Sequence, residues 1–139
     1  MPALSSVRFG PWLLQALPTA FLAILFLQSG IDKIIDFRGN QGYLTQHFGN
    51  SPLRGAVTPM LVTLTVIELS AGVLCGVGLV ELVVLGVARI AFWGICVAAT
   101  AFLALFFGQR IAKDYTGAAV LPAYFLVAMV GLWFTRPLH

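Results

Sequence analysis

The sequence predicts an all-α fold, an integral membrane four-helix transmembrane bundle, and two observations support this prediction. First, 60% of the 139 residues are hydrophobic, 9% are charged and the mean hydropathy is +0.97, whereas soluble domains carry about 25% charged residues. Second, the chain contains four apolar runs near the roughly 20 residues that a spanning helix needs. Lipid offers no hydrogen-bond partners to the backbone, so a spanning segment has to be a helix or a strand of a closed barrel. The runs lack the alternation of barrel strands, and helices are therefore expected.

The four predicted spans belong to a single transmembrane domain over residues 1–139. We expect them at roughly residues 11–36, 57–79, 82–107 and 118–135. Glycine, asparagine and proline predict a long loop over residues 37–55. A tight turn over residues 78–81 and a short polar connection over residues 108–117 should join the remaining spans. The first apolar run is too long for a signal peptide and is expected to remain as a helix.

Basic residues border the apolar runs, as they do in membrane proteins. Four of them lie on the side of the first and third connections, namely Arg38, Arg54, Arg110 and Lys113. The positive-inside rule therefore favours a cytoplasmic position for that side. Arg89 falls about 10 Å inside the third predicted span, where it is expected to snorkel toward the terminal side or to pair with Glu81.

Glu68 is the most informative polar residue. It lies about ten residues into the second predicted span, which at 1.5 Å per residue is on the order of 15 Å deep, near mid-membrane. A lone carboxylate there costs several kcal/mol, so it is expected to be protonated or paired. Ionisable residues inside a membrane mark functional sites by default. A carboxylate that only clamps helices, or a misplaced span that leaves it exposed, are the alternatives.

The stretch FLQSGIDKIIDF places charges at the end of the first predicted span. Gln28, Asp32 and Asp36 follow i, i+4, i+8 spacing and share one stripe of the helix. Ser29 and Lys33 form the adjacent stripe. Because Lys33 can snorkel toward the glutamate of the second span, we expect Lys33 and Gln28 to face inward and the aspartates to border the membrane. An interfacial cap without any site is the alternative.

Polar residues on the loop side of the predicted bundle form a candidate pocket. Its members come from three helices and the third connection, and they are Gln28, Asp32, Lys33, Glu68, Arg110, Asp114 and Tyr124. Gly72 and Gly76 follow Glu68 at i+4 and i+8 and form a GxxxG motif, which predicts close helix packing on the same face. No residue is assigned a catalytic role.

Metal and covalently bound cofactors are not expected. His47 and His139 lie outside the predicted spans, so a b-type haem between helices has no axial histidines, and no Cys/His cluster indicates zinc or iron–sulfur. Cys75 and Cys96 are interpreted as small buried residues. The chain has no basic run, so nucleic-acid binding is not expected. Any redox role would therefore place the electrons on a partner or on a diffusible quinone.

Three segments are distinctive together. They are FLQSGIDKIIDFRG at the end of the first span, IELSAGVLCGVGL in the second and QRIAKDYTGAAVLPAYFLVA leading into the fourth. These segments resemble the DoxX-like family of small four-span bacterial membrane proteins over most of the chain, from about Phe21 to Leu132. The matching features are Gly30, Lys33, Glu68, Gly72, Asp114 and Gly117. The chain departs from many relatives by carrying Glu81 and no basic residue in the second connection.

The resemblance implies a four-helix bundle in a bacterial inner membrane. The family is named from a small subunit of a thiosulfate:quinone oxidoreductase and quinol oxidase system. We therefore expect an accessory subunit of a bacterial membrane redox or respiratory complex, without catalytic activity of its own, that helps to shape a quinone site. Its partners would be the lipid bilayer and a larger membrane complex. A stand-alone binder or carrier of a small lipophilic molecule, and a purely structural or assembly subunit, are the alternatives.

Overall fold

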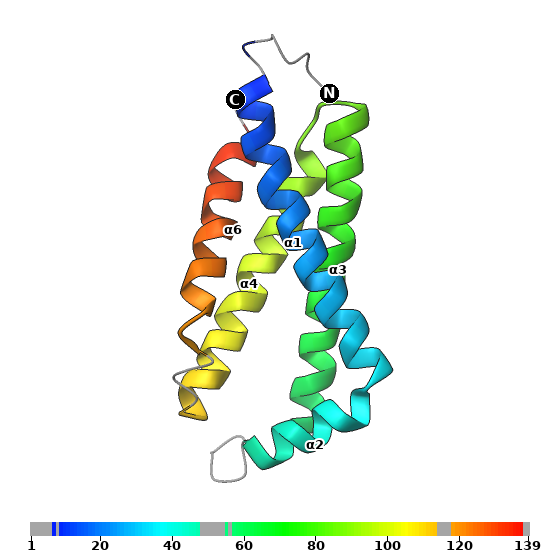
Figure 1. Ribbon diagram of the computed structural model, residues 1–139, viewed down its shortest axis with the longest axis vertical. Helices are drawn as coiled ribbons and strands as arrows, with labels where there is room; N and C mark the ends of the chain where they lie inside the picture. The colour runs from blue at the N-terminus through cyan, green and yellow to red at the C-terminus, as the bar shows by residue number, and fades with distance from the viewer. Residues whose placement is uncertain (1–6, 8, 48–54, 56, 114–117, 138–139) are drawn as a thin grey trace.

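The described part of the chain is all-α, as predicted. The computed structural model describes residues 7, 9–47, 55, 57–113 and 118–137, and these residues form five helices and no strand. The helices are α1 (Phe9–Ile35), α2 (Phe37–His47), α3 (Val57–Val84), α4 (Arg89–Ile111) and α6 (Leu121–Thr135) (Figure 1).

Three of these helices are long and apolar enough to cross a membrane, which indicates a membrane protein. They are α1, α3 and α4, with 27, 28 and 23 residues. Helix α6 is also apolar but has 15 residues, which is about 22 Å at 1.5 Å per residue and short of a hydrocarbon core of about 30 Å. Helices thus lie at all four predicted spans, and within the described residues three of them have spanning length.

The four apolar helices pack in a ring. Helix α1 contacts α3, α3 contacts α4, α4 contacts α6, and α6 contacts α1. They run roughly along the long axis of the molecule, with the start of α1 and the end of α6 at the same end (Figure 1). Their shared core contains Leu22, Phe26, Cys75, Ile95 and Phe102.

The outer surface of the ring is apolar. Large side chains that point outward include Ile24, Val66 and Leu126. Trp93 and Trp133 are each 63% exposed, near the start of α4 and the end of α6, which lie at the terminal end of the molecule (Figure 1). Tryptophan is enriched where a membrane meets water, so this end fits a membrane boundary.

Helix α2 replaces the first part of the predicted loop over residues 37–55, so that prediction is wrong for Phe37–His47. Gly39, Asn40 and Gly42, which contributed to the loop prediction, lie within this helix. It crosses the loop end of the molecule and contacts α1 and α3 (Figure 1). Residues 48–54 of the predicted loop lie outside the described residues. Asn40 Nδ2 donates to the Asp36 carbonyl over 2.9 Å, and Gln41 Nε2 donates to Thr58 Oγ1 over 2.6 Å. These contacts outweigh the low helix propensity of glycine.

The second connection lies later in the chain than the sequence predicts. Instead of turning at residues 78–81, α3 continues to Val84, and the chain turns over residues 85–88, where Gly86 has φ +69°. Gly78 is buried within α3 against α4 and therefore serves packing. Arg89 was expected inside a span. It is instead the first residue of α4, and its side chain is 77% exposed.

Glu81 organises the turn between α3 and α4. Its Oε1 accepts the backbone N–H of Ile90 over 3.1 Å, and its Oε2 lies 3.4 Å from Arg89 Nη2, while its side chain is 7% exposed. The first N–H groups of a helix lack partners within the helix and favour negative charge. Glu81, which belongs to α3, therefore caps the N-terminus of α4. Trp12 Nε1 donates to the Leu82 carbonyl over 3.0 Å and ties the same region to α1.

Glycine permits the closest approaches between helices. A Cβ at Gly72 would lie 2.8 Å from the backbone nitrogen of Leu27, and a Cβ at Gly94 would lie 2.8 Å from that of Cys75. A Cβ at Gly76 would meet nothing closer than Leu27 Cδ1 at 4.0 Å, an ordinary contact. Of the two glycines in the predicted GxxxG motif, Gly72 therefore makes the close approach to α1, and Gly76 does not.

Gly72→Ala should destabilise the protein, whereas Gly76→Ala should not. The new methyl at position 72 would overlap the α1 backbone, and overpacking typically costs about 1–3 kcal/mol. At position 76 the helix propensity of alanine should make the change neutral or stabilising by up to about 1 kcal/mol. Reversible unfolding in mixed detergent micelles measures both variants, and equal stabilities would contradict the assigned α1–α3 contact.

Glu81→Ala should lower the free energy of unfolding by about 1–2 kcal/mol, the usual cost of losing a helix cap. Arg89→Gln is the matched control, because its guanidinium is largely exposed and an exposed ion pair contributes about 0–1 kcal/mol. The same unfolding assay compares the two variants. A larger loss from Arg89→Gln than from Glu81→Ala would show that the ion pair, and not the cap, holds the turn.

Candidate functional site

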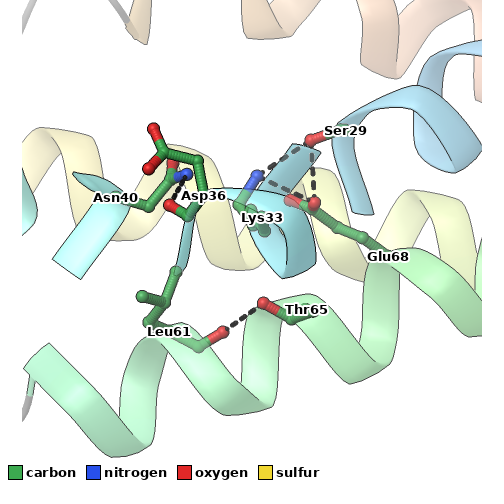
Figure 2. A network of polar contacts seen from close by, with 7 residues as sticks. All are labelled: Ser29, Lys33, Asp36, Asn40, Leu61, Thr65 and Glu68. Carbon is green, nitrogen blue, oxygen red and sulfur yellow. Dashed lines mark hydrogen bonds and ion pairs between the residues drawn. The ribbon is translucent and has the colours of Figure 1, made fainter. Parts of the chain in front are cut away.

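Three polar side chains meet where α1 contacts α3. Lys33 Nζ lies 2.9 Å from Glu68 Oε2. Ser29 Oγ donates to the same Glu68 oxygen over 2.8 Å and accepts from Lys33 Nζ over 2.8 Å. Figure 2 shows Ser29 and Lys33 of α1 directed toward Glu68 of α3. We call Ser29, Lys33 and Glu68 the polar triad.

The two charged members of the triad differ in burial. The Glu68 side chain is 1% exposed, and that of Lys33 is 17% exposed. Glu68 lies about 16 Å along α3 from its first residue at 1.5 Å per residue, so it is deep within a helix of spanning length. Lys33 is nearer the end of α1, and its long side chain reaches inward to Glu68.

Small residues bring the two helices close enough for a short serine to reach the glutamate. A Cβ at Gly30 would lie 2.8 Å from Leu69 Cγ, and a Cβ at Gly72 would lie 2.8 Å from the backbone nitrogen of Leu27. Gly30 follows Ser29 in sequence, and Gly72 is one helical turn beyond Glu68. The triad therefore lies within one helical turn of a close approach between the backbones of α1 and α3 at Gly72.

The geometry compensates for the cost of placing charges in an apolar environment. A buried ion pair is favourable only with short contacts and further hydrogen bonds, and here Ser29 supplies one to each partner. An ammonium group has three donors, of which two are directed at Ser29 and Glu68. The third has no partner among the described residues, and because 17% of the Lys33 side chain is exposed, Lys33 can donate a hydrogen bond to an acceptor that arrives from outside.

The predicted stripe of Gln28, Asp32 and Asp36 does not face α3. All three residues are exposed, and the inward orientation expected for Gln28 is therefore wrong. The adjacent stripe of Ser29 and Lys33 turns toward α3 instead. Because the two stripes are neighbours on the helix, their spacing alone does not determine which one faces inward. Ser29 was noted on this stripe but was not included in the predicted pocket.

Among the described residues, the polar contacts of Ser29, Lys33 and Glu68 involve none of the other predicted pocket residues. Arg110 is an exposed residue at the end of α4, and Asp114 lies outside the described residues. Tyr124 of α6 has its ring centroid 5.9 Å from that of Phe102 and 6.0 Å from that of Phe21. Phe102 in turn lies 4.8 Å from Phe26. Tyr124 thus belongs to an aromatic cluster that joins α1, α4 and α6.

A separate apolar groove lies between α4 and α6, with a volume of about 170 Å³. It is lined by Phe102, Leu103, Phe106, Leu121, Pro122 and Phe125. Near it in sequence, Gln109 Oε1 is buried and has no hydrogen-bond partner among the described residues. An unsatisfied buried polar group costs about 1–3 kcal/mol. The sequence analysis did not consider Gln109, although a glutamine in the last turns of an apolar helix was a usable signal.

The fold and the polar triad define an all-α membrane protein with an ion pair buried between two helices of spanning length. Comparisons with family models, with curated proteins and with solved structures found no match to the chain. The resemblance to the DoxX-like family therefore stays a prediction.

Lys33→Met should lower the free energy of unfolding by about 2–3 kcal/mol, because it leaves a carboxylate buried without its cation. Glu68→Gln should lower the free energy of unfolding by less, because the Lys33 ammonium can then extend toward water. The double variant should be more stable than the sum of the single effects implies, with a coupling of about 1–3 kcal/mol. Lys113→Met, at an exposed lysine, is the control. Strict additivity of the two changes would show that the pair contributes no interaction energy.

Proposed function

We propose that the chain is a four-span accessory subunit of a redox or respiratory complex in a bacterial inner membrane, and that its polar triad contributes to a quinone site. The observation that carries this proposal is the Lys33 ammonium. It is oriented by Ser29 and by Glu68, a carboxylate deep in a helix of spanning length, and its third donor has no partner among the described residues.

The chemistry of a quinone fits such a donor. A quinone head presents carbonyl oxygens that accept hydrogen bonds, and its tail requires apolar surroundings. Lys33 offers the donor, and Glu68 and Ser29 hold its ammonium group in place. Within the proposal, electrons come from the partner subunit, and this chain supplies binding and orientation only.

The sequence adds support of a different kind. Lys33, Glu68 and Gly72 are among the residues that carry the resemblance to the DoxX-like family, whose name derives from a subunit of a quinone-linked system. The outward-facing apolar side chains of α1, α3, α4 and α6 fit a lipid environment. The proposal also requires that α6 cross the membrane together with the three longer helices.

Purification from native membranes at low detergent tests the proposal, with mass spectrometry of proteins and lipids. We expect the chain to copurify with a larger membrane complex that contains a quinone. Lys33→Met should reduce the quinone per complex at least several-fold at unchanged subunit stoichiometry, and Lys113→Met should not, because Lys113 is exposed and is not part of the triad.

Two results would contradict the proposal. If the chain runs alone and carries no quinone, it is not a subunit of a quinone-dependent complex. If Lys33→Met lowers thermal stability but leaves the quinone content and activity per complex unchanged, the triad serves only to fix the contact between α1 and α3. That second result would favour the purely structural role.

A further inference from the structure

Gln28 is a polar side chain on the outer surface of α1. It is exposed and shares a stripe of the helix with Ile24 and Ile31, whose side chains are 67% and 47% exposed. Its neighbour in sequence, Ser29, donates to Glu68, so Gln28 lies at about the depth of the polar triad. An inward orientation was expected for this amide because lipid tails offer it no partner, yet the structure directs it outward.

Other outward-facing polar groups at membrane depth find partners within their own helix. The hydroxyls of Thr63, Ser70 and Thr100 each donate to the carbonyl four residues earlier. Gln28 has no hydrogen-bond partner among the described residues. Its amide offers two donors and one acceptor oxygen, and hydrocarbon satisfies none of them. The amide therefore requires a partner from outside the described chain.

Asp32 adds a negative charge to the same side of α1. It follows Gln28 at i+4, is exposed, and forms no ion pair with a described residue. Asp36 and Arg38 follow at the junction of α1 with α2, nearer to water, and carry opposite charges. A helix that packs here therefore meets an amide at membrane depth and a carboxylate about 6 Å closer to the loop end.

We call Ile24, Gln28, Ile31 and Asp32 the outer face of α1. We infer that this face docks a transmembrane helix of a partner subunit, which carries a hydrogen-bonding side chain opposite Gln28 and a basic residue opposite Asp32. Polar side chains join helices in membranes through such hydrogen bonds, and charged groups there pair with one another. The inference rests on the subunit role in the proposed function and does not depend on the quinone.

A second copy of the chain is the competing occupant, and Asp32 disfavours it. Two copies in one membrane share their orientation, so a symmetric contact sets each residue of the face near its own counterpart. Gln28 would tolerate this arrangement, because an amide both donates and accepts. Asp32 would bring two negative charges together, and like charges across an interface repel. A helix with a basic residue satisfies both side chains.

Photo-crosslinking in native membranes tests the inference. A benzophenone amino acid is introduced at Ile24, one turn from Gln28, or at Leu126 of α6 as a matched control, since these two side chains are 67% and 63% exposed. We expect Ile24 to crosslink to a protein that also copurifies with the unmodified chain. Mass spectrometry should locate the crosslink on a transmembrane helix with a basic residue near its loop-side end. Leu126 should not give this product.

Two variants test the side chains that carry the inference. Gln28→Leu and Asp32→Asn should each lower the yield of the Ile24 crosslink about threefold to tenfold, the weakening expected for one lost interhelical contact. Gln46→Leu, at an exposed amide of α2 outside the outer face of α1, is the control. Thermal stability of the isolated chain should not change, because Gln28 and Asp32 have no side-chain hydrogen bond or ion pair within the described residues.

Two results would overturn the docking face alone. The first is a complex that copurifies with the chain while Leu126, and not Ile24, crosslinks to it, or while Gln28→Leu leaves the Ile24 crosslink unchanged. The second is a product of twice the mass of the chain that Asp32→Asn strengthens, which would assign the face to a second copy.

The same experiment separates this inference from the proposed function. If Ile24 crosslinks as expected to a complex that holds no quinone, the docking face stands and the quinone site fails. If the chain runs alone and neither position crosslinks to another protein, the docking face and the subunit role both fail.

Discussion

Every polar group that a helix carries into hydrocarbon needs a partner within the protein, and the triad is where this constraint is strongest in the structure. Glu68 is almost fully buried, and its charge is tolerable only while Lys33 and Ser29 of α1 face it. A rotation of α1 by one residue, about 100°, would instead turn the stripe of Gln28 and Asp32 toward Glu68. Asp32 would then bring a like charge to the buried carboxylate. The ion pair thus selects the face that α1 presents to α3.

The same constraint acts at the opposite end of α3. There Glu81 accepts from the backbone of α4, and Trp12 of α1 donates to the backbone of α3. Between these ends the helices pack through small residues, with Gly72 against α1 and Gly78 and Gly94 at the α3–α4 contact. Lipid offers helices little hydrophobic gain from association, so packing and hydrogen bonds have to stabilise the bundle. Helix α3 takes part in all of these contacts and is the centre of the arrangement.

Much of this fold could be predicted from the sequence, because apolar runs of spanning length leave few alternatives in lipid. The contact between Lys33 and Glu68 could also be foreseen, since a buried carboxylate requires a partner within reach. The prediction of a loop was wrong for Phe37–His47, because side-chain and tertiary contacts stabilise this segment as helix α2 despite its glycines and asparagine. The predicted turn failed because Gly78 serves packing against Ala91 and the chain turns at Gly86 instead. The predicted inward orientation of Gln28 was wrong, because residue spacing shows which side chains share a stripe of the helix but not which stripe is buried. Gln109 was missed although a glutamine in the last turns of an apolar helix was a usable signal; its buried oxygen is seen only in the structure.

The direct ion pair between Lys33 and Glu68 can be measured in a lipid bilayer. The chain contains two lysines and two glutamates, so selective labels of lysine Nζ with ¹⁵N and glutamate Cδ with ¹³C give few signals. Rotational-echo double-resonance NMR of the protein in lipid bilayers then measures their dipolar coupling. The structure, with Lys33 Nζ 2.9 Å from Glu68 Oε2, predicts strong dephasing of one lysine signal, which Lys33→Met removes. Absence of dephasing at both lysines in the bilayer would contradict the account.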